Sequence, residues 1–155
     1  SAPSPFDVSA CGKTKVCYFD PPCVPGGSGD GACTMAFSFK PVDDQHVEME
    51  LWGTIETEDM SANNFYVAIS FSTDDRMGDD AVTECSQLLN GQASVKASYN
   101  YYHDENAKSG PDNRRIEGEE SVRPSIYSQS TLSTADGYIY CKFTQRIADI
   151  PNNNK

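Results

Sequence analysis

The chain has 155 residues, 37% of them hydrophobic and 10% aromatic, which is enough for one domain with a buried core and too little for two. Twelve Lys and Arg against 23 Asp and Glu give a net charge of −11, which repels phosphate backbones and anionic lipid headgroups. Nucleic-acid binding and membrane-surface binding are therefore poor predictions, and because no run of about 18 apolar residues occurs, direct membrane insertion of this segment is not predicted either.

The N-terminal part of the chain is dominated by residues that interrupt regular structure. Residues 1–32 contain five prolines and the run GGSGDG over residues 26–31. Proline and glycine at this density prevent long helices and strands. We predict a loop-rich, disulfide-stapled collar over residues 1–32, followed by the main domain over residues 33–155.

Six cysteines predict disulfides and an oxidising compartment. They are Cys11, Cys17, Cys23, Cys33, Cys85 and Cys141. The chain has no CxxC pair and only two histidines, so the spacing does not suit a zinc site. Six cysteines allow 15 connectivities, among which the sequence does not choose. We expect Cys85 to pair with Cys141 and the first four to pair among themselves.

The cysteines favour an extracellular or lumenal location. The first ten residues, SAPSPFDVSA, lack the basic start and apolar stretch of a signal peptide, and no Asn-X-Ser/Thr sequon is present. We therefore expect a processed or excised ectodomain of a membrane protein.

Beyond the collar the hydrophobic pattern has a period of two. In the run HVEMELWGTI, Val47, Met49 and Leu51 fall on one face, while polar residues and Trp52 fall on the other. Similar runs, separated by turn signals at Asn90-Gly91 and Asp136-Gly137, predict an all-β antiparallel sandwich. The predicted strands lie near Val16, Thr34, Val47, Phe65, Val82, Val95, Ile126 and Ile139.

Two segments stand out within this pattern. The run Phe65 to Phe71 is rather apolar on both faces, which predicts a central strand covered on each side. Residues 104–123 are polar and rich in Gly and Pro, so they are predicted to form a long surface loop.

An acidic turn follows the first of these segments and contains a single methionine, Met77. Because Met77 has no periodic apolar neighbours, it is either an ordinary loop residue or a soft ligand. Four carboxylates surround it, and a calcium-dependent adhesion module built on them is a weaker alternative, because their spacing is not that of a calcium loop. These carboxylates are Asp74, Asp75, Asp79 and Asp80.

Four stretches of the chain form a recognisable series: the frame CGKTKVCYFDPPC, a strand with Trp52-Gly53, the run YVAISFSTDDRMGDDAVTEC and the run GYIYCKF. Together they resemble the DOMON domain of the ferric-chelate reductase 1 (stromal cell derived receptor) group. The resemblance covers about Cys11 to Phe143. It implies an immunoglobulin-like β-sandwich that holds one b-type haem between an axial methionine and an axial histidine. It also implies partnership with a transmembrane b-type cytochrome domain or an extracellular electron acceptor such as chelated ferric iron.

In this resemblance the axial methionine matches Met77. In haem-bearing relatives the histidine ligand comes after further strands, and this sequence ends before them. The module is therefore shortened, continues beyond Lys155, or belongs to the relatives without haem. Of the two histidines, His46 is expected at the surface, and His103 is the remaining ligand candidate, because the neighbouring Asp104 carboxylate can accept a hydrogen bond from its ring. Aromatic residues of the Phe65 to Phe71 strand, Tyr66 and Phe71, are expected to help form the wall for the macrocycle.

The expected function is that of an electron-transfer module of a ferric-reductase-like system rather than a stand-alone enzyme. A Met/His haem iron is six-coordinate, which suits electron transfer and not oxygen chemistry. The alternative is a haem-free extracellular sandwich that binds a protein, a glycan or a small aromatic ligand. Nucleophilic catalysis is not predicted, because no GxSxG motif occurs.

Overall fold

The computed structural model describes residues 5–20, 23, 32–55, 64–72, 80–101, 112–115, 127–135 and 137–146. Within this part of the chain, almost all regular structure is β-strand, with one short 3-10 helix, η1. The elements are η1 (Val8–Ala10), β1 (Val16–Asp20), β2 (Met35–Pro41), β3 (His46–Thr54), β4 (Phe65–Phe71), β5 (Asp80–Gln87), β6 (Ala93–Tyr101), β7 (Asp112–Arg115), β8 (Tyr127–Ala135) and β9 (Tyr138–Arg146).

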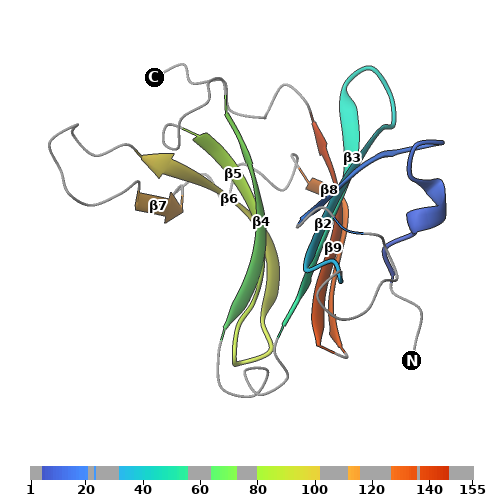
Figure 1. Cartoon of the computed structure of the whole chain (residues 1–155). Coiled ribbons are helices and arrows are strands. Elements are labelled where there is room, and N and C mark those ends of the chain that lie inside the picture. The colour runs from blue at the N-terminus through green and yellow to red at the C-terminus, as the bar shows by residue number, and fades with distance from the viewer. Residues whose placement is uncertain are drawn as a thin grey trace, which may run out of the picture.

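The strands form two antiparallel sheets that stack as layers (Figure 1). The five-stranded sheet has the order β1-β2-β3-β9-β8, and the four-stranded sheet has the order β4-β5-β6-β7. The predicted all-β antiparallel sandwich is therefore confirmed. The turn signals are confirmed too, since Gly91 and Gly137 adopt φ angles of 80° and 79°, which glycine reaches without steric cost.

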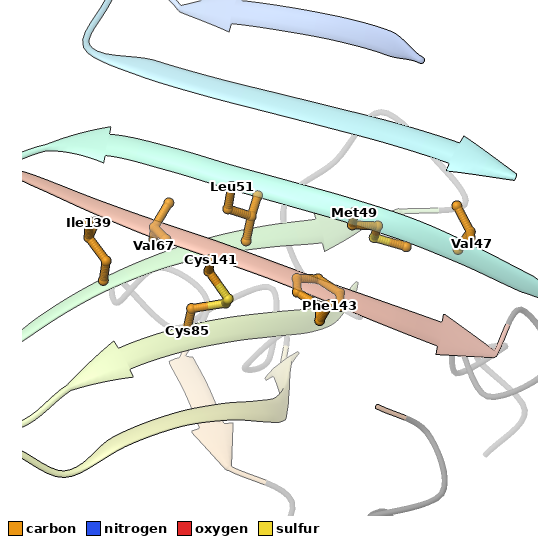
Figure 2. Packing of buried hydrophobic residues seen from close by; sticks show 8 residues of the cluster. All are labelled: Val47, Met49, Leu51, Val67, Cys85, Ile139, Cys141 and Phe143. Carbon is orange, nitrogen blue, oxygen red and sulfur yellow. A yellow bond between two sulfur atoms is a disulfide. The ribbon is translucent and has the colours of Figure 1, made fainter. Parts of the chain in front are cut away.

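The core lies between the sheets, where the apolar alternate residues of both layers meet (Figure 2). The predicted apolar face of β3 is confirmed, because Met49 and Leu51 are each 2% exposed. The buried cluster consists of Val47, Met49, Leu51, Val67, Cys85, Ile139, Cys141 and Phe143. It draws on β3 and β9 of one sheet and on β4 and β5 of the other, so this cluster holds the two layers together.

Three disulfides are present, and their pairing confirms the prediction. Cys85 on β5 bonds to Cys141 on β9, which links the two sheets covalently through the core, as Figure 2 shows. The N-terminal cysteines pair as Cys11–Cys17 and Cys23–Cys33. The collar is also joined to the sandwich by its own strand, because β1 pairs with β2 in the five-stranded sheet.

One prediction about strands is wrong, and one strand was not predicted. β4 is the edge strand of the four-stranded sheet and not a central strand covered on both faces. Every second residue of β4 points outward and is exposed, and Tyr66 is 72% exposed. The outward face looked apolar in the sequence because it carries an aromatic residue and small residues, which do not need burial. The polar excursion after β6 contains a short strand, β7, because backbone pairing with β6 does not require apolar side chains.

Glu50 lies on the face of β3 that the alternating pattern predicts to be polar and exposed, but its carboxylate is buried. Glu50 is 6% exposed and accepts hydrogen bonds from Ser38 Oγ and the Tyr140 hydroxyl, each at 2.8 Å. Lys15 of the collar places its Nζ 2.5 Å from Glu50 Oε2 and 4.2 Å from the centre of the Phe6 ring. The collar thus covers the outer face of the five-stranded sheet and supplies the cation that neutralises Glu50.

The network changes how its members titrate. Burial raises the pKa of Glu50, but the hydrogen bonds from Lys15, Tyr140 and Ser38 outweigh this, so the pKa lies below its ordinary value. Burial and the adjacent Glu50 carboxylate raise the pKa of Tyr140 well above its ordinary value. Glu50 is thus ionised and Tyr140 is a neutral donor at neutral pH.

Candidate functional site

A hollow of about 490 Å³ lies on the outer face of the four-stranded sheet, away from the core. Its wall comes from β4, β5 and β6, whose alternate residues point away from the Cys85–Cys141 disulfide. The lining residues are Asn64, Phe65, Tyr66, Ala68, Ser70, Val82, Glu84, Ser86, Leu88 and Asn100. The volume is within the range of about 300–1,000 Å³ that is usual for small-molecule and cofactor sites.

The floor of the hollow includes two buried polar residues of β5, Glu84 and Ser86, which bond to serines of the adjacent strand β6. Glu84 is 9% exposed and Ser98 is fully buried, and the Ser98 hydroxyl donates to Glu84 Oε2 at 3.4 Å. Ser86 is 4% exposed and shares a hydrogen bond of 3.2 Å with the Ser94 hydroxyl. Polar side chains on a sheet face that points away from the core are usually exposed to solvent, whereas these are buried. We therefore take this face as the strongest candidate site in the described part of the chain.

These floor residues were not predicted from the sequence. Since Cys85 faces the core, the period of two places Glu84 and Ser86 on the opposite face, and that is the only signal the sequence offers. Their burial depends on the neighbouring strand β6, where Ser98 and Lys96 are the register partners of Val82 and Glu84. Strand pairing of this kind is not apparent in the sequence.

The two predicted iron ligands lie outside the described residues, but the strands that flank them are described. Met77 belongs to the connection between β4 and β5, and His103 follows the end of β6 by two residues. The register pairs Phe71 with Ala81 and Asp80 with Asn100. Both connections therefore start at the same end of the same sheet, the end at which Ser70, Val82 and Asn100 line the hollow.

The two predicted wall residues lie on opposite faces of β4. Tyr66 lines the hollow and is strongly exposed at 72%. Phe71 packs against the core cluster between the sheets. His46, expected at the surface, is partly exposed and lies 2.9 Å from the Asp43 carboxylate.

Nothing among the described residues forms a metal cage of three or more His, Cys, Asp or Glu side chains. The predicted calcium-binding carboxylates Asp74, Asp75 and Asp79 lie outside the described residues, and Asp80 begins β5. In the described ranges, no helix has the length and apolar character needed to cross a membrane.

Comparison with known proteins gives the family. The chain is similar over 99 residues, with 30% identity, to a Danio rerio protein named "Putative ferric-chelate reductase 1". These residues are 64% of this chain but 16% of the relative, so the chain corresponds to a small part of that protein. No solved structure matches. The DOMON domain family matches residues 30–154, which include every strand from β2 to β9. This chain belongs to the DOMON domain family.

Proposed function

We propose that this chain is an extracellular or lumenal haem b-binding module that exchanges electrons with a membrane cytochrome or with an extracellular ferric acceptor. The observation that carries the proposal is the placement of the hollow. It lies on the sheet from whose one end the connections bearing Met77 and His103 both start.

The residues present suit a haem. Phe65, Tyr66 and Val82 supply apolar surface for a macrocycle in a hollow of about 490 Å³. A thioether and an imidazole form a donor set that haem iron accepts, and Met77 and His103 are the residues proposed to supply it. When bound between such ligands, the iron is six-coordinate and carries one electron at a time.

The residues of the chain would set the conditions for that chemistry. The Tyr66 ring, Ala68 and Val82 would exclude water from one face of the macrocycle. The buried Glu84 side chain, which accepts a hydrogen bond from Ser98, would add a polar group to the wall of the hollow. A methionine ligand would favour the ferrous state of the iron and so raise its reduction potential.

The membrane partner and the location are parts of the same proposal. The Danio rerio relative is named as a ferric-chelate reductase, and this chain corresponds to only part of its length. Such a part would serve as an electron-transfer module rather than a complete enzyme. Three disulfides, with no free cysteine among the described residues, support an oxidising compartment outside the cytosol.

The test is haem uptake by matched pairs of variants. Wild-type protein mixed with haem b is expected to develop a sharp Soret band that shifts on reduction. Met77→Ala and His103→Ala are each expected to lose the six-coordinate spectrum. Met35→Ala and His46→Ala, which change the same residue types at an exposed position of β2 and a partly exposed position of β3, are expected to retain it.

A colourless wild-type protein would contradict the proposal. That outcome would favour the haem-free binding module, for which the exposed Tyr66 ring beside the polar floor of the hollow is the supporting observation. If wild type binds haem but the Met77 and His103 variants resemble their controls, then other residues hold the iron.

A further inference from the structure

β4 is an edge strand without the usual protection against pairing. Edge strands in soluble proteins are commonly short, charged, bulged or covered, because their free backbone groups otherwise recruit another strand. β4 has the sequence FYVAISF, with no charge and no proline, and its register with β5 is continuous. In the described part of the chain, no strand pairs with its outer side.

The other three edge strands each have a protective feature. β1 is tied through Cys17 to Cys11 and ends at Asp20. β7 has four residues, all of them polar or charged. β8 has a register shift between Ser128 and Thr131. The missing protection is therefore specific to β4.

The sheet opposite β4 extends beyond it. β4 packs against β3 and β9, and β6 packs against β8, so the four-stranded sheet covers the β3-β9-β8 side of its partner. The inner faces of β2 and β1 continue past β4 by two strand positions, which is roughly 10 Å at the usual strand spacing. We call this part of the inner face the overhang.

The overhang is apolar and exposed. Tyr18 on β1 stacks with Phe37 and Phe39 on β2 at centroid distances of 6.2 and 6.4 Å, yet Tyr18 is 59% exposed. Val16 and Met35 are 45% and 49% exposed. A groove of about 560 Å³ runs between Met35 and the edge residues Phe65 to Ala68. The edge of β4 and the exposed Met35 side chain of the overhang thus border the same groove. The stack of Tyr18, Phe37 and Phe39 continues the apolar surface of the overhang along β1 and β2.

The geometry disfavours a second copy of the chain as the occupant. Antiparallel pairing of two β4 strands about a two-fold axis places both five-stranded sheets on one side of the joined sheet. The β3 strand of the second copy would then need the space that β2 occupies in the first. A single extended segment has no second layer and meets no such obstacle.

We propose that the groove beside β4 binds one extended segment of a partner protein, added as a strand to the four-stranded sheet. The segment's inward residues are apolar, because they face Tyr18, Phe37 and Met35. Its outward residues are basic, because the chain carries a net charge of −11 and β4 itself has no charge to oppose them. Backbone bonds to β4 supply affinity, and the overhang selects the alternate side chains.

The test uses a fluorescent nine-residue peptide of alternating lysine and valine and the wild-type chain with its disulfides intact. We expect saturable binding by fluorescence anisotropy and slower hydrogen exchange of the β4 amides. A peptide with its central valine replaced by proline has the same charge but cannot complete the ladder, so about tenfold weaker binding is expected.

A matched pair of variants locates the site. Tyr18→Lys places a charge in the overhang and is expected to weaken binding about tenfold. Leu89→Lys makes the same change of charge at a residue with 58% exposure in the turn after β5, and is expected to leave binding unchanged. Equal binding of the proline peptide, equal effects of the two variants or unchanged β4 exchange would each overturn the proposal. So would self-association by sedimentation that Tyr18→Lys abolishes.

Discussion

The residue with the most demanding environment outside the hollow is Glu50. Its carboxylate is buried on the outer face of the five-stranded sheet and depends on Lys15, Ser38 and Tyr140 for its partners. A buried carboxylate without such partners would take up a proton. The stability of the collar on the sheet is therefore linked to the ionisation of one side chain.

This linkage predicts a pH dependence of stability. Since the pKa of Glu50 is lowered in the folded state, its contribution is present above the ordinary carboxyl pKa of about 4.3 and is lost as pH falls through the lower folded value. Glu50→Gln is expected to cost about 3 kcal/mol at pH 7, because Lys15 stays buried without its counter-charge. The deficit should shrink when denaturant unfolding is repeated towards pH 3.

Glu48→Gln is the control for this experiment. Glu48 is on the same strand and pairs with Lys142 at 3.3 Å, but both side chains are partly exposed, so a cost below about 1 kcal/mol is expected. If the deficit of Glu50→Gln does not change with pH, the carboxylate is not the ionised centre of the network.

Ser70 allows a steric test of the hollow that changes no proposed ligand. Its side chain is exposed and lines the end of the hollow at which the connections containing Met77 and His103 start. Ser70→Trp is expected to fill that end and reduce haem uptake at least about tenfold, as judged by a Soret titration. Val8→Trp, at an exposed collar position, should bind as wild type does. Normal uptake by Ser70→Trp would place the cofactor elsewhere.

At the residue scale the sequence supplied candidates but not their surroundings. Met77 was selected because its neighbours are acidic and not apolar, which is a local property. The buried states of Glu50 and Glu84 were not predictable, because each depends on side chains from other strands or from the collar. Alternation shows which face a residue takes, whereas burial depends on what covers that face.

At the scale of elements, eight of the nine strands in the described part of the chain were predicted from strand-like runs and the turn residues between them. β7 was missed because its sequence, DNRR, is polar throughout. The edge position of β4 was missed because a strand of aromatic and small residues looks alike at the edge and in the centre of a sheet. Sheet order depends on pairings between distant segments, which composition does not encode.

The disulfide that links the two sheets is expected to stabilise the protein more than the short-range disulfide of the collar does. Cys85 and Cys141 are separated by 56 residues, so removing both by Cys85→Ala/Cys141→Ala should lower the free energy of unfolding by about 4 kcal/mol through loop-closure entropy. Cys11→Ala/Cys17→Ala opens a loop with a separation of only 6 and should cost about 2 kcal/mol. Urea unfolding measures both values. Equal costs would show that loop length does not decide them.

At the scale of the whole molecule, the sandwich presents different features on different sides. The collar covers the outer face of the five-stranded sheet, the hollow occupies the outer face of the four-stranded sheet, and the groove follows the edge of β4. The two proposals thus concern adjoining surfaces, because Asn64, Phe65, Tyr66 and Ala68 line both the hollow and the groove. A protein partner in the groove would be held close to the hollow, an arrangement that suits a module receiving or delivering electrons.

The resemblance noted in the sequence was sufficient for the family and the sandwich, both of which are confirmed. It did not identify the hollow, because the hollow requires Tyr66, Glu84 and Asn100 to be brought together from three strands. Met77 and His103 as the two axial ligands both stay predictions, since both lie outside the described residues.

The most direct test of the central claim is a haem titration of the wild-type chain with its disulfides intact, followed by absorption spectroscopy before and after reduction. The account predicts saturation at one haem per chain and a low-spin, six-coordinate spectrum in both oxidation states. A titration without saturation, or a spectrum that shows an open coordination position, would contradict it.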